Sequence, residues 1–440
     1  MSVADEVPAA ESSPAAQWFQ FMLSVPDSRP RIWDFPEGSS PSEILVAHRD
    51  FPAHGGAPKT ITIADMYQGR CPFLWSPATV RGLLEGRQVT VAAGPVAILD
   101  SNVLDAVHLY CTDRDRLKEM REPVRDFLLF LVERGFDISP IFYYYEATAR
   151  ATDPEHWRDI ARARAKTVLA LQTMDTRRFL RSGGEEIVAH PRGESLQLEY
   201  SGVQSVEELL DRHAGAASPE DAAALAGSVR YLYASLLKAA LIQHGGRRRS
   251  IAERYRMLGE FMTKELGMTL GPERFVGLFY FARPSELPRF LPDLGPDSNR
   301  TRFLGSVLSA SWDLLLLRLP ENLLGATGRS ARIADETCVL PFLCTADGVL
   351  RKLATSRVIR TVFEFPPELG GRNVIAGHTT DLLEGVVPED VMAAIVEETI
   401  GADAERRADA NAFAPIGPEA LEKVIMRLEE EVAAIARRDT

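Results

Sequence analysis

The pattern of apolar and polar positions predicts two buried strands that each end beside an acid. Residues 96–99 form an apolar run that stops at Asp100, and residues 338–344 form another, followed by Thr345 and, two positions later, by Asp347. A short apolar run that ends in small polar residues is typical of a strand inside a sheet. In an open α/β sheet, the loops at the carboxyl ends of the strands converge on a crevice where ligands bind. Asp100 and Asp347 are therefore candidate site residues.

Two further acids fall within predicted helices. Residues 139–140, Ser-Pro, are typical of a helix start, and Glu146 lies four residues after Phe142, on the same helical face. Residues 303–317 predict a helix that is apolar over most of its circumference, and this helix contains Asp313. All four acids thus stand in apolar surroundings, in the order Asp, Glu, Asp, Asp.

Burying these carboxylates requires compensating positive charge. An unpaired carboxylate is costly to bury, and neighbouring carboxylates raise one another's pKa. Arg318 and Arg351, each close in sequence to one acid, would provide compensation in a purely structural ion-pair network. A divalent cation is the alternative, and a set of oxygen ligands without His or Cys at ligand spacing favours Mg²⁺ or Mn²⁺ over zinc.

The turn after the first strand also has a purely structural interpretation. Ser101 and Asn102 are residues that cap helices through their side-chain oxygens. Asp-Ser-Asn is then an ordinary connection from a strand to a helix, with no chemistry in it.

The acids and the two strand-end motifs resemble those of the PIN-domain ribonucleases. The motifs that carry the resemblance are Asp100-Ser101-Asn102, Trp312-Asp313-Leu314-Leu315 and Thr345-Ala346-Asp347, together with an acid on a helix after Ile138-Ser139-Pro140. The resemblance covers residues 93–150 and about 301–370. It implies a three-layer α/β/α core around a central, mainly parallel sheet.

The same resemblance implies a function. The metal-binding and catalytic residues would be Asp100, Glu146, Asp313 and Asp347, which would gather one or two Mg²⁺ or Mn²⁺ ions to activate water for phosphodiester hydrolysis. Ser101, Asn102 and Thr345 would be supporting residues that fix the turns. The expected substrate is single-stranded or structured RNA. Because bacterial PIN-like proteins are often toxins or defence effectors, the resemblance also suggests a protein inhibitor or antitoxin as a partner.

The domain organisation departs from that family in one respect. Between Glu146 and Asp313 the chain predicts a large, mostly helical insertion, within which residues 187–200 are expected to be extended. The predicted divisions are a disordered tail at 1–15, an N-terminal segment of uncertain fold packing on the core at 16–92, the two core parts at 93–150 and 301–375, the insertion at 151–300, and a C-terminal helical region at 376–440.

Several residues are candidates for contacting nucleic acid. Three basic residues recur every four positions on one predicted helical face, three arginines stand together in a loop, and one of the tyrosines before Glu146 is expected to face the site. These are Arg158, Arg162 and Lys166; Arg247, Arg248 and Arg249; and Tyr143. A solvated or salt-bridged helix face, and core packing for the tyrosines, are the structural alternatives.

Composition narrows the class of protein. The net charge of −12 over 440 residues argues against a protein that coats nucleic acid, although a metal site with a local basic patch is compatible with a nuclease. Four scattered cysteines favour neither a disulfide framework nor a zinc site. We expect a cytoplasmic protein without a signal peptide or membrane span.

Other interpretations remain open from the sequence. Residues 418–438 predict a helix with an apolar stripe, which would dock on its own domain, form a homodimer contact or bind a partner helix. The core would alternatively be a noncatalytic or partner-gated scaffold that binds nucleic acid or regulates. A phosphatase of the haloacid dehalogenase type also places Asp after a strand, but it requires a second Asp where this chain has Asn102.

Overall fold

The computed structural model describes most of the chain. The described residues are 32–34, 49–52, 60–64, 66–67, 73–75, 90–150, 154–214, 219–245, 248–268, 271–283, 299–323, 327–330, 333–355, 359–364, 374–378 and 415–436, with positions 291, 292, 294, 387, 389 and 391–393. The predicted tail at 1–15 and Arg247 lie outside these residues.

The centre of the fold is a parallel pair of strands. β5 (Thr90–Leu99) and β8 (Ile333–Thr345) pair in register from Ala93 opposite Cys338 to Leu99 opposite Cys344. Both are the strands that the sequence predicts, and their carboxyl ends lie next to each other. Ala97, Ile98 and Leu99 are fully buried, although successive strand residues point to opposite faces. Both faces of the sheet are therefore covered here.

The remaining strands make the sheet mixed. β1 (Ile32–Asp34) and β6 (Asp137–Ser139) pair with β5 in parallel. β3 (Thr60–Ile63) and β7 (Thr327–Ser330) pair with β8 in the antiparallel sense, and β2 (Arg49–Pro52) adds to β3. β4 (Phe73–Trp75), β9 (Ile359–Glu364) and β10 (Val374–His378) form a second sheet. The segment 16–92 thus contributes strands to both sheets and does more than pack on the core.

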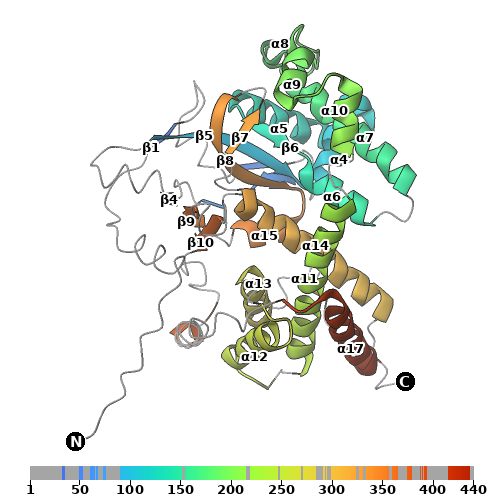
Figure 1. Cartoon of the computed structure of the whole chain (residues 1–440), viewed down its shortest axis with the longest axis vertical. Helices are drawn as coiled ribbons and strands as arrows, with labels where there is room; N and C mark the ends of the chain where they lie inside the picture. The colour runs from blue at the N-terminus through green and yellow to red at the C-terminus, as the bar shows by residue number, and fades with distance from the viewer. Residues whose placement is uncertain are drawn as a thin grey trace, which may run out of the picture.

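Helices connect the strands and surround the sheet (Figure 1). Those of the two predicted core parts are α4 (Ser101–Thr112), a 3-10 helix η1 (Arg114–Met120), α5 (Arg121–Glu133), α6 (Ile141–Arg150), α14 (Arg300–Leu323) and α15 (Gly348–Thr355). With the sheet they form a mixed α/β protein. α4 begins directly after β5, and α15 follows β8 after a two-residue turn, which is the strand-to-helix order that the sequence predicts.

The insertion is helical, as predicted. Its helices are α7 (Pro154–Thr173), α8 (Thr176–Arg181), α9 (Gly193–Ser201), α10 (Val206–Ala214), α11 (Pro219–Gly245), α12 (Ile251–Lys264) and α13 (Gly271–Ala282). They form two groups. α7 contacts α4, α6, α9 and α10 beside the sheet, whereas α11 packs on α12, α13 and α14 at the other end of the molecule (Figure 1).

One prediction within the insertion is wrong. Residues 193–201 form helix α9 and are not extended. Leu196, Leu198 and Tyr200 alternate as they would in a strand, but α9 packs against α7, and this tertiary contact outweighs the local pattern. Only the segment before it is extended, with Ala189 bridging to Met174.

Two core helices are unusually apolar. Within α11 and α14, Leu225–Gly245 and Arg300–Pro320 are long and apolar enough to cross a membrane by length and composition, which the sequence analysis did not anticipate. More than half of each stretch is buried inside the protein, and the two helices pack against each other. Helices at the centre of a protein core meet the same criteria, so this packing accounts for their composition.

The C-terminal helix docks on its own chain. α17 (Pro418–Ala436) packs on α11 and α14, and its predicted apolar stripe faces them. Leu421, Ile425, Leu428 and Val432 are all buried. The stripe is therefore part of the core, which is the first of the alternatives for this helix.

We expect Leu428→Ala to lower the free energy of unfolding by about 2–5 kcal/mol, because it opens a cavity at a fully buried position. Met426→Ala, on the same helix but 55% exposed, serves as the control and should change it by less than about 0.5 kcal/mol. Urea denaturation of both variants tests this. Equal stabilities would show that α17 does not dock as described.

Candidate active site

The register of β5 and β8 brings the two predicted strand-end motifs together. The backbone N–H of Asp100 donates to the carbonyl oxygen of Cys344 at 2.9 Å. Thr345 Oγ1 donates to Asp100 Oδ2 at 2.9 Å and accepts from the backbone N–H of Asp347 at 3.0 Å. One buried hydroxyl therefore links the acid after β5 to the loop after β8.

Asp100 is a buried carboxylate without a cationic partner. Its side chain is almost fully buried, and among the residues that the structure describes no Lys or Arg forms an ion pair with it. Burial raises the pKa of Asp100 from 3.8 to about 6; the hydrogen bond from Thr345 acts against this rise, and the Glu146 carboxylate adds to it. The ionised form is thus destabilised unless positive charge is supplied.

The turn after Asp100 is not a simple helix cap. Asp100 occupies the N-cap position of α4, but its side chain makes no capping hydrogen bond. Ser101 Oγ instead donates a hydrogen bond to Glu146 Oε2, across to α6. The hydroxyl of Ser101 thus holds the Glu146 carboxylate. It does not cap the helix that begins at Ser101, as the purely structural interpretation of this turn would require.

Asp347 is held in place by the helix that follows it. Its Oδ1 accepts the backbone N–H groups of Val349 at 2.7 Å and Leu350 at 2.9 Å, at the start of α15. Within the described part of the chain, its other carboxylate oxygen has no hydrogen bond. One oxygen fixes the side chain, and the second remains available to a ligand.

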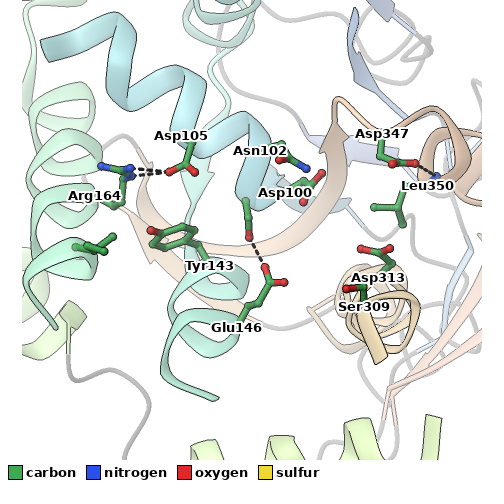
Figure 2. Close-up of a pocket in the computed structure, with 12 residues that line it drawn as sticks. Asp100, Asn102, Asp105, Tyr143, Glu146, Arg164, Ser309, Asp313, Asp347 and Leu350 are labelled. Carbon is green, nitrogen blue, oxygen red and sulfur yellow. Dashed lines mark hydrogen bonds and ion pairs between the residues drawn. The ribbon is translucent and has the colours of Figure 1, made fainter. Parts of the chain in front are cut away.

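All four predicted acids line a single cavity of about 470 Å³ (Figure 2). They come from the end of β5, from α6, from α14 and from the loop after β8. The lining residues are Asp100, Ser101, Asn102, Asp105, Tyr143, Glu146, Ile160, Arg164, Ser309, Asp313, Asp347 and Leu350. Elements that are far apart in the sequence therefore present acids to one space.

The two arginines that would make a structural network pair elsewhere. Arg318 forms a salt bridge with the buried Glu273, with Nε 2.7 Å from Oε1, and Arg351 lies 3.5 Å from Asp50. Neither lines the cavity. These contacts do not support the purely structural explanation of the four acids.

The cavity also contains residues that the sequence analysis did not select. Asp105 and Ser309 are each four positions from a selected residue, Ser101 and Asp313 respectively, so helical spacing was the available signal. Arg164 Nε and Nη2 both lie 2.7 Å from Asp105 Oδ1. No local sequence pattern identifies Arg164 as a cavity residue, because its ion-pair partner Asp105 lies on a different helix, α4.

The predicted basic face of α7 points away from the cavity. Arg162 pairs with Glu207 and with Asp211, at 2.7 Å from the latter, which is the salt-bridged alternative for this face. Arg158 and Lys166 are exposed and do not line the cavity. The face of α7 that does reach the cavity carries Ile160 and Arg164.

The other nucleic-acid candidates have different positions. Arg248 and Arg249 are exposed, precede α12 at the lower end of Figure 1, and do not line the cavity. Tyr143 does line it, but its ring is only 5% exposed and meets Tyr144 edge-on. Tyr143 is thus a wall of the cavity and offers little surface on which a base would stack.

The donor chemistry of the cavity suits a hard divalent cation. Asp100, Glu146, Asp313 and Asp347 provide carboxylate oxygens, and Mg²⁺ and Mn²⁺ bind oxygen ligands. In the described part of the chain, no three His, Cys, Asp or Glu side chains already stand as a ligand set around one point. Binding would require the carboxylates to move closer through side-chain rotation.

Comparison with known proteins finds no counterpart. No family model, curated protein or solved structure matches this chain. Its function has to be inferred from the cavity itself.

We expect Thr345→Val to lower the free energy of unfolding by about 1–3 kcal/mol, because the buried Asp100 carboxylate and the Asp347 N–H both lose a partner. Thr345→Ser keeps the hydroxyl and should be less destabilised. Denaturant unfolding with EDTA present distinguishes the two variants. A valine variant as stable as the serine variant would contradict the bridging role of this hydroxyl.

Without metal, the protein should lose stability as the pH rises from 4 to 6, because of Asp100. Over this range Asp100 is already ionised in the unfolded state but still protonated in the folded state, so raising the pH favours unfolding. Above pH 6 the folded protein bears the full cost of the buried, ionised carboxylate. A rise in pKa from 3.8 to about 6 corresponds to about 3 kcal/mol. Asp100→Asn should thus stabilise the protein at pH 7.5 by up to about that amount, and hardly at pH 4.

Urea unfolding in EDTA from pH 4 to pH 7.5 measures how Asp100→Asn changes the free energy of unfolding. Asp159→Asn, which removes an exposed carboxylate from α7, is the matched control for the loss of one negative charge. A stability difference between Asp100→Asn and the unmodified protein that stays constant from pH 4 to 7.5 would exclude the shifted pKa.

Proposed function

We propose that this protein is a divalent-metal-dependent nuclease, an endoribonuclease that hydrolyses phosphodiester bonds in single-stranded or structured RNA. The observation that carries the proposal is the shared cavity: four acids from separate elements line it, and the most buried of them, Asp100, has no cationic partner among the described residues. A cavity of this composition favours a cation over a free anion.

We also propose a three-layer, PIN-like core for the two parts of the chain around β5 and β8. The burial of successive residues on both faces of β5 supports it, since helices must then cover both sides. α4 contacts β5 and β8, and α14 and α15 contact β8. The antiparallel strands β2, β3 and β7 would be additions at the edge of this core.

Mg²⁺ or Mn²⁺ would be held directly by Asp100 and Asp347, with Glu146 and Asp313 completing the site directly or through water. When bound, such an ion polarises the phosphate and lowers the pKa of the attacking water. Its charge would also offset the burial of Asp100, whose ionised form is otherwise disfavoured.

The residues around the acids would hold them in position. Thr345 fixes Asp100, Ser101 fixes Glu146, and the start of α15 fixes one oxygen of Asp347. Asn102 also lines the cavity and acts against the rise in the pKa of Asp100. Supporting contacts of this kind keep ligand oxygens oriented, and their loss commonly weakens metal binding by about 10- to 100-fold.

Asp100→Asn should reduce cleavage of RNA by about 100-fold or more while leaving the fold intact, because it removes a negative ligand without changing the shape of the side chain. The assay is cleavage of mixed single-stranded RNA and DNA with Mg²⁺, Mn²⁺ or EDTA. Asp159→Asn is the matched control and should cleave like the unmodified protein.

Full activity of Asp100→Asn would exclude the proposed site. Calorimetry with Mn²⁺ separates the remaining outcomes. Metal binding without cleavage would indicate an enzyme that requires a partner, whereas no binding at all would favour the noncatalytic scaffold.

A further inference from the structure

One end of the cavity holds an arginine that the proposed chemistry does not use. Asp105, Tyr143 and Arg164 lie together on one side of Figure 2, and Asp313 and Asp347 lie on the other. Among the described lining residues, Arg164 is the one Lys or Arg. Its side chain is 17% exposed and lines the cavity.

The contacts of Arg164 fix its orientation and leave donors free of Asp105. Nε and Nη2 both reach Asp105 Oδ1, and a guanidinium has five N–H donors in a rigid planar fork. Tyr143 lies on the same side of the cavity as this ion pair (Figure 2). Since the Asp105 side chain is 50% exposed, this ion pair contributes little to stability. Its effect is to hold the guanidinium against the cavity wall.

The charges of the cavity determine what can bind there. Five carboxylates and one guanidinium line it, so an isolated anion is repelled, and an anion bound together with a divalent cation is not. Arginine forks match phosphate oxygens, and a cavity of about 470 Å³ is large enough for a small-molecule group. A nucleic-acid segment presents one phosphate to the acids and a second one at a fixed spacing along the strand.

We infer that Arg164 forms a second phosphate subsite, which binds a phosphate adjacent to the scissile one, and that Asp105 positions it. This inference rests on the proposed nuclease function and specifies its substrate: a strand that carries at least two phosphates within the cavity. The second phosphate is either an internal diester of a longer strand or a terminal monophosphate. Both present the same oxygens to Arg164.

The test uses short RNAs of one sequence with a single preferred cleavage site. The first RNA carries only natural diesters. Two others carry a neutral methylphosphonate, one on the 5′ side and one on the 3′ side of the scissile bond. The fourth ends in a monophosphate next to the scissile bond, in place of the adjacent internal diester. Cleavage kinetics and binding by fluorescence anisotropy, both with Mn²⁺, are compared for the unmodified protein, Arg164→Gln, Arg164→Lys and Arg256→Gln. Arg256 is exposed on α12 and controls for the loss of one positive charge.

We expect Arg164→Gln to raise KM by about 10- to 100-fold with little change in kcat, and Arg164→Lys to raise it less. One methylphosphonate should weaken binding to the unmodified protein by a similar factor and should have no further effect on Arg164→Gln, because both changes remove the same contact. Equal KM values for the monophosphate RNA and the internal-diester RNA mean that Arg164 binds either kind of phosphate. A lower KM for one of them shows which kind of phosphate the subsite prefers.

Asp105→Asn tests the positioning role. It should raise KM less than Arg164→Gln does, and the double variant should match Arg164→Gln alone. A purely structural ion pair would instead change the melting temperature and leave the response to the methylphosphonate intact.

The outcomes separate the two proposals. Suppose that the unmodified protein cleaves RNA in a metal-dependent manner, that Arg164→Gln has the same KM, and that a methylphosphonate weakens RNA binding equally for both. This result overturns the subsite and leaves the nuclease. RNA binding that depends on Arg164, without any cleavage and without Mn²⁺ binding by calorimetry, overturns the nuclease and leaves the phosphate subsite. Absence of both binding and cleavage overturns both.

Discussion

The parallel pairing of β5 with β8 is the interaction on which the rest of the structure depends. Because Leu99 stands opposite Cys344, the two strands end side by side, and the Thr345 hydroxyl can bond to both Asp100 and the loop of Asp347. A shift of one residue would turn the side chains of β8 to the opposite faces and separate these groups. The buried sheet centre therefore fixes the cavity as well as the fold.

The electrostatics of the cavity follow from that burial. Asp100 is placed where its ionised form is costly, and Arg318 and Arg351, each close in sequence to another of the acids, pair with Glu273 and Asp50. Hydrogen bonds from neutral groups lessen the cost without removing it. This is the arrangement in which a bound cation contributes most, since it lowers the free energy of every carboxylate that faces it.

The helical insertion contributes to both ends of the molecule. Its first helix, α7, brings Ile160 and Arg164 to the cavity, and its longest helix, α11, forms the core against which α14 and α17 pack. The insertion thus adds Ile160 and Arg164 to the lining of the cavity, and it supports α14, which carries Asp313 and Ser309. One group of helices in the insertion lines the cavity and the other forms the core around α11, although the two groups follow each other directly in the sequence.

The sequence by itself determined the two central strands β5 and β8, the turns that follow them and the four acids that line the cavity, because apolar runs, small polar residues and helical spacing are local properties of the chain. It also indicated that α17 would bury its stripe. Tertiary structure decided which basic residue reaches the cavity: the regular stripe of Arg158, Arg162 and Lys166 faces away, whereas Arg164 is directed inward by Asp105 on another helix. The same holds for α9, whose strand-like alternation is overridden by packing on α7. Contacts between distant segments depend on the sheet register and on helix packing, and neither is encoded in a local pattern.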